Sequence, residues 1–203
     1  LRPTPELSFA VRYLGCARGI VITASHNPKE YNGYKVYGED GGQIPPQIAD
    51  KIIKYINGTD IFDGVKLCDE PKINIIGEEV DSAYIKAVKE QSLGTKIPDD
   101  FKVVYTPLHG SGNIPVRRVL AETGVKNVFV VPEQENPDGD FPTVKSPNPE
   151  NSEAFDIAIE YAKEKNADLI FGTDPDSDRI GVVVKTTDGD YKVLNGNQTG
   201  CLL

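Results

Sequence analysis

Two short polar segments of this chain could carry chemistry, and each follows a predicted buried strand. The first is Thr23-Ala24-Ser25-His26-Asn27-Pro28, and the second is Gly-Thr-Asp-Pro-Asp-Ser-Asp-Arg at residues 172–179. In open α/β sheets, ligands bind just outside the carboxyl ends of the strands. Both segments are therefore candidates for a binding or catalytic site.

Ser25 is predicted to lie on a loop, where a substrate could reach its hydroxyl group. His26 looks like a base for this hydroxyl, but neighbouring side chains usually point apart, so adjacency does not establish a Ser–His pair. The segment also lacks the G-x-S-x-G pattern of a hydrolase nucleophile elbow. Considered alone, Ser25 is more typical of a helix cap or a turn than of a nucleophile.

The second segment places Asp174, Asp176 and Asp178 at alternate positions of one short loop. Such carboxylates repel one another unless a cation lies between them, and hard oxygen ligands suit Mg²⁺ or Ca²⁺. A calcium-binding EF-hand loop is rejected, because Arg179 and Lys185 stand where that loop needs Gly and Glu. The alternative is a turn with solvated aspartates. Arg179 favours function, because a guanidinium group binds phosphate with two parallel hydrogen bonds.

A third motif, Asn32-Gly33-Tyr34-Lys35, would on its own be a hairpin turn followed by an exposed lysine. Lys35 follows Ser25 by ten residues across the predicted loop, so it can return to the same site. There its ammonium group could neutralise a phosphate or exchange a proton with a hydroxyl group.

Hydrophobic patterns predict the elements that position these motifs. In the first half we expect strands at residues 18–23 and 34–37, a polar loop at 24–33, a turn at 38–42, and helices at 46–57 and 80–88. Ile48, Ile52, Ile53 and Ile56 recur at helical spacing. Residues 93–100 are a predicted linker, after which the pattern restarts.

In the second half we expect strands at 101–105, 127–131 and 168–172, helices at 114–122 and 151–165, and a final hairpin of 180–185 with 191–194 around Asp188-Gly189. Asn151 or Ser152 is predicted to cap the second of these helices. Alternation of strands and helices predicts parallel βαβ units, and hence two small α/β domains that divide near residues 85–100.

Composition narrows the class of protein. The 203 residues carry a net charge of −9, which argues against nucleic acid as a partner. No apolar run approaches the roughly 20 residues that cross a bilayer, and no signal peptide is visible. Cys16, Cys68 and Cys201 form no CxxC pair, so we predict reduced thiols, buried as small hydrophobic groups, in a cytoplasmic protein.

Both ends of the chain look cut, because it has no Met and its last residues are Gly200-Cys201-Leu202-Leu203. The alternative is amino-terminal processing of a complete protein.

These motifs together resemble the α-D-phosphohexomutase superfamily of phosphoglucomutases and phosphomannomutases. The segment 23–35 resembles the phosphoserine loop of that family, and 172–179 resembles its metal loop. Thr106-Pro107-Leu108-His109-Gly110, Pro147-Asn148-Pro149-Glu150 and Asn195-Gly196-Asn197-Gln198 resemble further family segments. These motifs are long and occur in the family's order. The sequence around them is most similar to the phosphoglucomutase and phosphopentomutase branch.

The resemblance implies two small three-layer α/β domains with mixed sheets. Residues 1–85 would be the latter part of the family's first domain, 86–192 its second domain, and 193–203 the start of its third. The family has four domains. The sugar-recognition loop of the third domain and the phosphate-clamping loop of the fourth are absent from this sequence, so we expect little activity from the chain alone.

The resemblance also implies a mechanism. Phosphorylated Ser25 would donate its phosphoryl group to a hexose monophosphate, and the sugar bisphosphate, glucose 1,6-bisphosphate for a phosphoglucomutase, would return its other phosphate to Ser25. Mg²⁺ would be held by Asp174, Asp176, Asp178 and a phosphoserine oxygen. The catalytic residues would be Ser25, Lys35 and Arg179, and the residues that bind phosphate would be His26, Asn27, Lys35 and Arg179. His109 is expected to shape the site.

Other functions remain open at this stage. The substrate could be a mannose or pentose phosphate, because the sugar-recognition loop is missing. The chain could also be a module that binds a metal or a phosphosugar without catalysis. The sequence predicts no oligomeric state.

Overall fold

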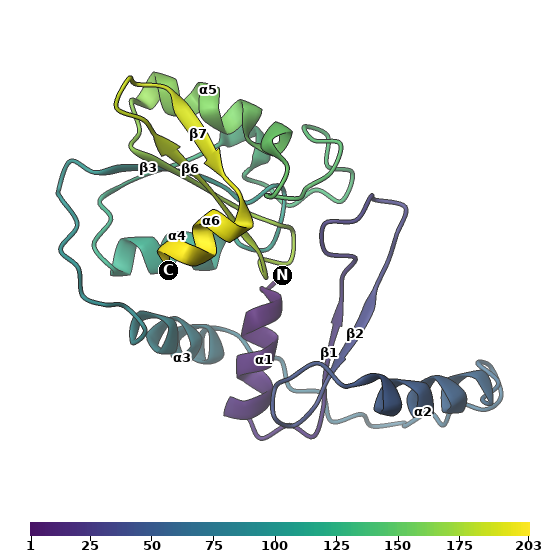
Figure 1. Cartoon of the computed structure of the whole chain (residues 1–203). Coiled ribbons are helices and arrows are strands. Elements are labelled where there is room, and N and C mark those ends of the chain that lie inside the picture. The colour runs from purple at the N-terminus through teal and green to yellow at the C-terminus, as the bar shows by residue number, and fades with distance from the viewer.

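The structure, a computed structural model, describes all residues 1–203 (Figure 1). The helices are α1 (Thr4–Tyr13), α2 (Pro46–Asn57), α3 (Glu78–Lys89), α4 (Asn113–Glu122), α5 (Asp156–Lys165) and α6 (Gly196–Leu202), with short 3-10 helices η1 (Pro132–Gln134) and η2 (Ser152–Phe155). The strands are β1 (Gly19–Ile22), β2 (Tyr34–Tyr37), β3 (Lys102–Thr106), β4 (Asn127–Val130), β5 (Leu169–Thr173), β6 (Ile180–Lys185) and β7 (Tyr191–Leu194).

The second half of the chain forms a five-stranded mixed sheet in the order β4-β3-β5-β6-β7. Strand β3 pairs in parallel with β4 and with β5, whereas β6 and β7 are antiparallel additions. Figure 1 shows α5 on one side of this sheet and α4 on the other, so this part has three layers. The predicted α/β class and mixed sheet are confirmed here. The final hairpin is also confirmed, and Gly189 adopts the positive φ of 87° that its turn requires.

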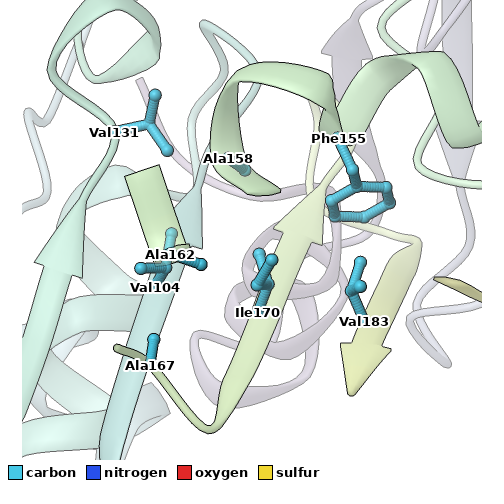
Figure 2. Close-up of a cluster of buried hydrophobic side chains, with 8 residues drawn as sticks. All are labelled: Val104, Val131, Phe155, Ala158, Ala162, Ala167, Ile170 and Val183. Atoms are coloured by element: carbon cyan, nitrogen blue, oxygen red, sulfur yellow. The ribbon is translucent and has the colours of Figure 1, made fainter. Parts of the chain in front are cut away.

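The main hydrophobic core lies between this sheet and α5 (Figure 2). Val104, Ile170 and Val183 project from three neighbouring strands toward Ala158 and Ala162 of α5, and all five side chains are fully buried. Small alanines on this face of the helix let it approach the sheet closely. The core therefore fixes β3 and β5, whose carboxyl ends lead into the predicted functional segments.

Phe155 fills the space above two glycines that face each other across β5 and β6. Gly172 is paired with Gly181 in the sheet register, and a Cβ atom at either position would lie 2.7 Å from the Phe155 ring. Neither glycine has a positive φ, so the requirement is for space and not for backbone conformation. The glycine that begins the aspartate segment is thus required by packing.

The first half of the chain departs from the predicted parallel βαβ pattern. Strands β1 and β2 form a two-stranded antiparallel sheet, because the loop between them contains no helix that could return the chain to a parallel start.

Helix α2 begins and ends as predicted, but none of its residues is buried. Its predicted apolar face therefore lies at the surface, with Ile53 and Ile56 more than half exposed.

Two smaller predictions are wrong. Neither Asn151 nor Ser152 caps α5 with its side chain, because a 3-10 turn, η2, precedes the helix and Phe155 occupies the cap position. The cysteines are not buried: all three are free, but Cys68 and Cys201 are exposed and Cys16 is half-buried. No helix of the structure combines the length and the apolar character needed to span a membrane.

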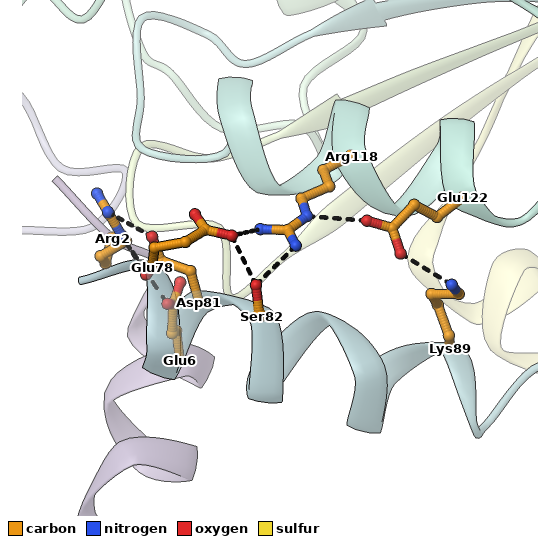
Figure 3. Close-up of polar contacts among 8 residues, drawn as sticks. All are labelled: Arg2, Glu6, Glu78, Asp81, Ser82, Lys89, Arg118 and Glu122. Carbon is orange, nitrogen blue, oxygen red and sulfur yellow. Dashed lines mark hydrogen bonds and ion pairs between the residues drawn. The ribbon is translucent and has the colours of Figure 1, made fainter.

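A line of polar contacts joins the two halves of the chain (Figure 3). Arg2, just before α1, contacts Asp81 of α3 through two hydrogen bonds of 2.7 and 2.6 Å. Arg118 of α4 contacts Glu78 at the start of α3, at 2.9 Å. Helix α3 therefore packs against elements of both halves. The domain boundary expected after residue 85 falls within this helix, and the division into domains stays a prediction.

Glu6 lies behind this line of contacts, and its side chain is only 5% exposed. Burial, and next the hydrogen bond with Asp81, raise the pKa of Glu6 to about 7. The folded chain therefore binds a proton at Glu6 that the unfolded chain releases above its ordinary pKa of 4.5. Stability from this group is complete at low pH and is lost as the pH rises through about 7.

We expect the free energy of unfolding to fall by about 1 to 3 kcal/mol between about pH 5 and about pH 8 because of Glu6. In Glu6→Gln this part of the pH dependence should disappear, whereas Glu164→Gln, at an exposed position, should behave as wild type. Urea unfolding at several pH values would measure the difference. Equal slopes for wild type and Glu6→Gln would show that the Glu6 carboxyl group is not held in its neutral form.

Candidate active site

Ser25 lies on the loop that follows β1, in a left-handed conformation with a φ of 54°. Its backbone N–H donates to the hydroxyl of Thr23 at 2.9 Å. This turn directs the Ser25 Oγ atom toward the second half of the chain, where it donates to Asp174 Oδ2 at 2.8 Å. Two residues separated by 149 positions in the sequence are thereby brought into contact.

His26 Nδ1 lies 3.2 Å from Ser25 Oγ, although neighbouring side chains were expected to point apart. The left-handed conformation of Ser25 accounts for the difference, because it turns the two side chains toward each other. Since the serine hydroxyl has one proton and donates it to Asp174, the histidine is assigned as the donor in this contact.

Lys35 reaches the same site because β2 runs antiparallel to β1, with Lys35 opposite Val21 in the register. Its Nζ atom donates to Asp176 Oδ2 at 3.0 Å and lies 3.5 Å from Asp178 Oδ2. Burial alone would lower the pKa of Lys35, but the hydrogen bond and charge of Asp176, together with Asp178, outweigh it and raise the pKa. Lys35 is therefore a fixed positive charge in this structure.

The aspartate loop connects β5 to β6, two antiparallel strands of the central sheet. Its compact shape is held from within, since the backbone N–H groups of Asp178 and Arg179 each donate to Asp174 Oδ1 at 3.1 Å. Ser177 takes a positive φ of 54° at the turn. One oxygen from each of Asp174, Asp176 and Asp178 lies within 4.8 Å of the others. The three carboxylates expected to act together are thus brought together.

The electrostatics of this cluster favour a bound cation. Asp174 is fully buried, and burial first, with the neighbouring Asp176 second, raises its pKa to about 7. Asp176 is itself only 5% exposed, and its Oδ1 atom is buried without a hydrogen-bond partner. A bare buried carboxylate oxygen is costly unless a charge compensates it. Three clustered carboxylates with one such oxygen fit a divalent cation that prefers oxygen ligands.

Thr4 is a residue of this site that the sequence analysis missed. Its hydroxyl donates to Asp176 Oδ2 at 3.0 Å, and its backbone N–H donates to the Asp176 carbonyl at 2.8 Å. No helix was predicted over α1, although Pro3 and Pro5 flank Thr4 and proline is typical of the first turn of a helix. That signal could have located the start of α1, but not its contact with the aspartate loop.

The side chains of two predicted phosphate-binding residues make no hydrogen bond with the aspartates or with Ser25. The Arg179 side chain is 40% exposed, and its nearest ionic partner is Glu150 at 3.8 Å. Asn27 is exposed, and its backbone N–H donates to Ala24. Both side chains flank the loops that carry Ser25 and the aspartates, so their roles stay predictions.

His109 lies in a chain of hydrogen-bonded polar groups that does not include Ser25. Its Nδ1 lies 3.2 Å from the Asn136 carbonyl oxygen, which can only accept, so Nδ1 is the protonated nitrogen. Its Nε2 therefore accepts from Thr143 Oγ1 at 2.9 Å, and Thr143 in turn accepts from Gln134 Nε2 at 3.0 Å. Both ring nitrogens have partners, so His109 connects the segment after β3 to Asn136 and Thr143, and its role in the site stays a prediction.

The fold and this cluster define a class of α/β protein in which an acidic loop at the end of a central strand faces a serine loop from a separate hairpin. The domain II model of the phosphoglucomutase/phosphomannomutase family, an α/β/α domain, matches residues 82–189, and the domain I model matches residues 1–61. The chain belongs to the phosphoglucomutase/phosphomannomutase family.

Individual relatives agree with this assignment. The whole chain is similar to a phosphoglucomutase from Staphylococcus saprophyticus, at 41% identity, and covers 38% of that protein. A probable phosphomannomutase from Haemophilus influenzae is 43% identical over 99% of this chain, which covers 42% of that relative. Among solved structures, a putative phosphomannomutase from Thermus thermophilus matches 90% of this chain and 40% of its own, with 26% identity and a TM-score of 0.72. The chain thus spans about two fifths of the length of these relatives.

Proposed function

We propose that this chain carries the phosphoserine and metal-binding part of a phosphohexomutase, which interconverts hexose 1-phosphate and hexose 6-phosphate. The observation that carries the proposal is the 2.8 Å contact between Ser25 Oγ and Asp174 in the aspartate cluster. A nucleophile for phosphoryl transfer requires positive charge beside it, because the transferred group is strongly anionic. Lys35 supplies one such charge, and a cation bound by the aspartate cluster would supply another.

In this proposal, Asp174, Asp176, Asp178 and Ser25 hold Mg²⁺. Bound there, the ion would supply positive charge beside the transferred phosphoryl group. Ser25 Oγ is the atom that gives and receives the phosphoryl group. Its O–P bond breaks as the sugar hydroxyl oxygen bonds to phosphorus; the sugar hydroxyl loses its proton and Ser25 Oγ gains one, and the second half-reaction runs in the reverse sense. Glucose 1,6-bisphosphate is the proposed intermediate and activator.

The surrounding residues have separate proposed roles. The raised pKa of Lys35 favours its charged form, which supports a role in holding anionic oxygens, and we propose that it also exchanges a proton with the reacting hydroxyl group. His26, Asn27 and Arg179 are proposed to bind phosphate beside it. His26 is the best placed of the three, since it already contacts Ser25.

The identity of the sugar is a further part of the proposal. We propose a phosphoglucomutase that acts in the cytoplasm, and the phosphoglucomutases among the similar proteins support this choice. A phosphomannomutase is the second candidate, because a probable phosphomannomutase is as similar in sequence as they are. Assays of the full-length protein with glucose 1-phosphate and mannose 1-phosphate would separate the two.

The metal site can be tested with Asp176→Asn. This change removes one negative ligand and should weaken Mg²⁺ binding at least about tenfold, and binding to wild type should tighten when Ser25 is phosphorylated. The matched control is Asp69→Asn, which makes the same change at an exposed position outside the cluster. Titration calorimetry would measure the affinities. Equal affinity of wild type and Asp176→Asn would contradict the assignment.

A further inference from the structure

The amino-terminal end of α1 rests directly on the aspartate loop. The residue before the helix is Pro3, and no side chain caps the first turn. The free N–H of Thr4 instead donates to the carbonyl of Asp176 at 2.8 Å. The first N–H groups of a helix need partners from outside the helix, and this loop supplies one. Helix α1 is thereby attached to Asp176, whose carboxylate is a proposed metal ligand.

The Thr4 hydroxyl adds a second contact, which acts on the ligand side chain itself. It donates to Asp176 Oδ2 at 3.0 Å, and Lys35 Nζ donates to the same oxygen, also at 3.0 Å. The other oxygen, Oδ1, is buried and receives no hydrogen bond. Two donors on one oxygen fix the rotation of the carboxylate and leave the other oxygen available.

We propose that Thr4 is a positioning residue for the metal site: its hydroxyl holds Asp176 so that Oδ1 is presented to the divalent cation. This inference rests on the proposed function, because it takes the cation to be bound by the aspartate cluster. Thr4 is only 4% exposed and lies on a helix, so its hydroxyl has a fixed place. Lys35 donates to the same oxygen but is also proposed to bind phosphate, so Thr4 is the donor on Oδ2 that has no second proposed role.

The backbone contact alone does not account for the hydroxyl contact. If Thr4 served only to attach α1, its N–H bond to the Asp176 carbonyl would be enough, and the hydroxyl could be lost without effect on the ligand. Partners that orient a metal ligand typically change metal affinity by about 10- to 100-fold when they are removed. The two roles therefore predict different Mg²⁺ affinities for a variant that lacks only the hydroxyl.

The experiment compares Mg²⁺ binding by calorimetry in the 203-residue chain, with metal-free thermal unfolding of the same samples. Thr4→Val replaces the hydroxyl by a methyl group of similar size. If that variant does not fold, Thr4→Ala removes the hydroxyl without adding a methyl group in its place. Thr4→Ser restores the hydroxyl. Thr123→Val is the matched control, since the hydroxyl of Thr123 bonds only within its own helix region, to Val119 and Leu120.

We expect Thr4→Val and Thr4→Ala to bind Mg²⁺ about tenfold more weakly than wild type, and Thr4→Ser and Thr123→Val to stay within about twofold. Wild-type affinity in the valine and alanine variants would overturn the positioning role while leaving the metal site intact. A loss in Thr4→Ser as large as in Thr4→Val would also overturn it, because the hydroxyl would then not be the group that matters. A wild-type chain that does not bind Mg²⁺ would overturn the proposed metal site, and this inference with it.

Discussion

Ser25→Ala should abolish phosphoryl exchange between a labelled sugar bisphosphate and a sugar monophosphate in the full-length protein. The variant lacks the oxygen that we propose to carry the phosphoryl group, and no other hydroxyl is both on this loop and in contact with Asp174. Loss of a nucleophile costs about 10⁴-fold or more in turnover. This is the largest effect expected of any single substitution in the chain.

The matched control for this prediction is Ser92→Ala, which removes an exposed serine hydroxyl in the segment after α3. It should leave exchange unchanged. If Ser25→Ala retained near-normal exchange, the nucleophile would be another group, and the contact between Ser25 and Asp174 would have only a structural role. Mg²⁺ binding measured on the same variant would show whether the cluster itself remains intact.

The 203-residue chain on its own should fold and bind Mg²⁺ but show negligible mutase activity. Transfer requires that one phosphate of the sugar is at Ser25 while the other is held some distance away. This chain spans about two fifths of the length of its relatives, and we propose that the second contact comes from segments outside these 203 residues. Positioning of reacting groups contributes about 7 to 11 kcal/mol to lowering a barrier, so its loss should reduce turnover by about 10⁵-fold or more.

The measurement is conversion of glucose 1-phosphate by the chain, with Mg²⁺ and a trace of glucose 1,6-bisphosphate, beside the full-length protein at the same concentration. Circular dichroism and Mg²⁺ calorimetry on the chain serve as controls that it is folded and binds metal. Turnover comparable to that of the full-length protein would show that the segments outside this chain contribute little to positioning.

Local patterns predicted most single elements of the fold. Strand β2 and the turn at Gly189 occur where the sequence places them, because alternation and turn residues act over a few positions. Helix α1 was not predicted, although Pro3 and Pro5 are a local signal for its start, whereas the contact of its first turn with Asp176 has no local signal. The antiparallel pairing of β1 with β2 was also missed, because the pairing direction depends on the path of the loop and not on either strand.

The same distinction holds for the site. Spacing singled out Ser25 and the three aspartates as candidates, and the structure brings them together with Lys35, whose return to Ser25 was expected although the antiparallel pairing was not. The contact of His26 with Ser25 was not foreseen, because it depends on one left-handed residue. Thr4 was missed because the contact that gives it a role spans 172 positions of sequence. Contacts between residues so far apart in the sequence depend on how whole helices and strands pack. A local sequence pattern contains no information about that packing.

The most direct test of the account is the location of a phosphoryl group on the protein. The full-length protein would be incubated with glucose 1,6-bisphosphate and Mg²⁺, digested, and its peptides analysed by mass spectrometry. We predict one added phosphoryl group on Ser25, absent from Ser25→Ala and removed again by excess glucose 1-phosphate or glucose 6-phosphate. An unmodified Ser25 in a protein that is active with these sugars, or a phosphoryl group on another residue that exchanges at the rate of turnover, would contradict the account.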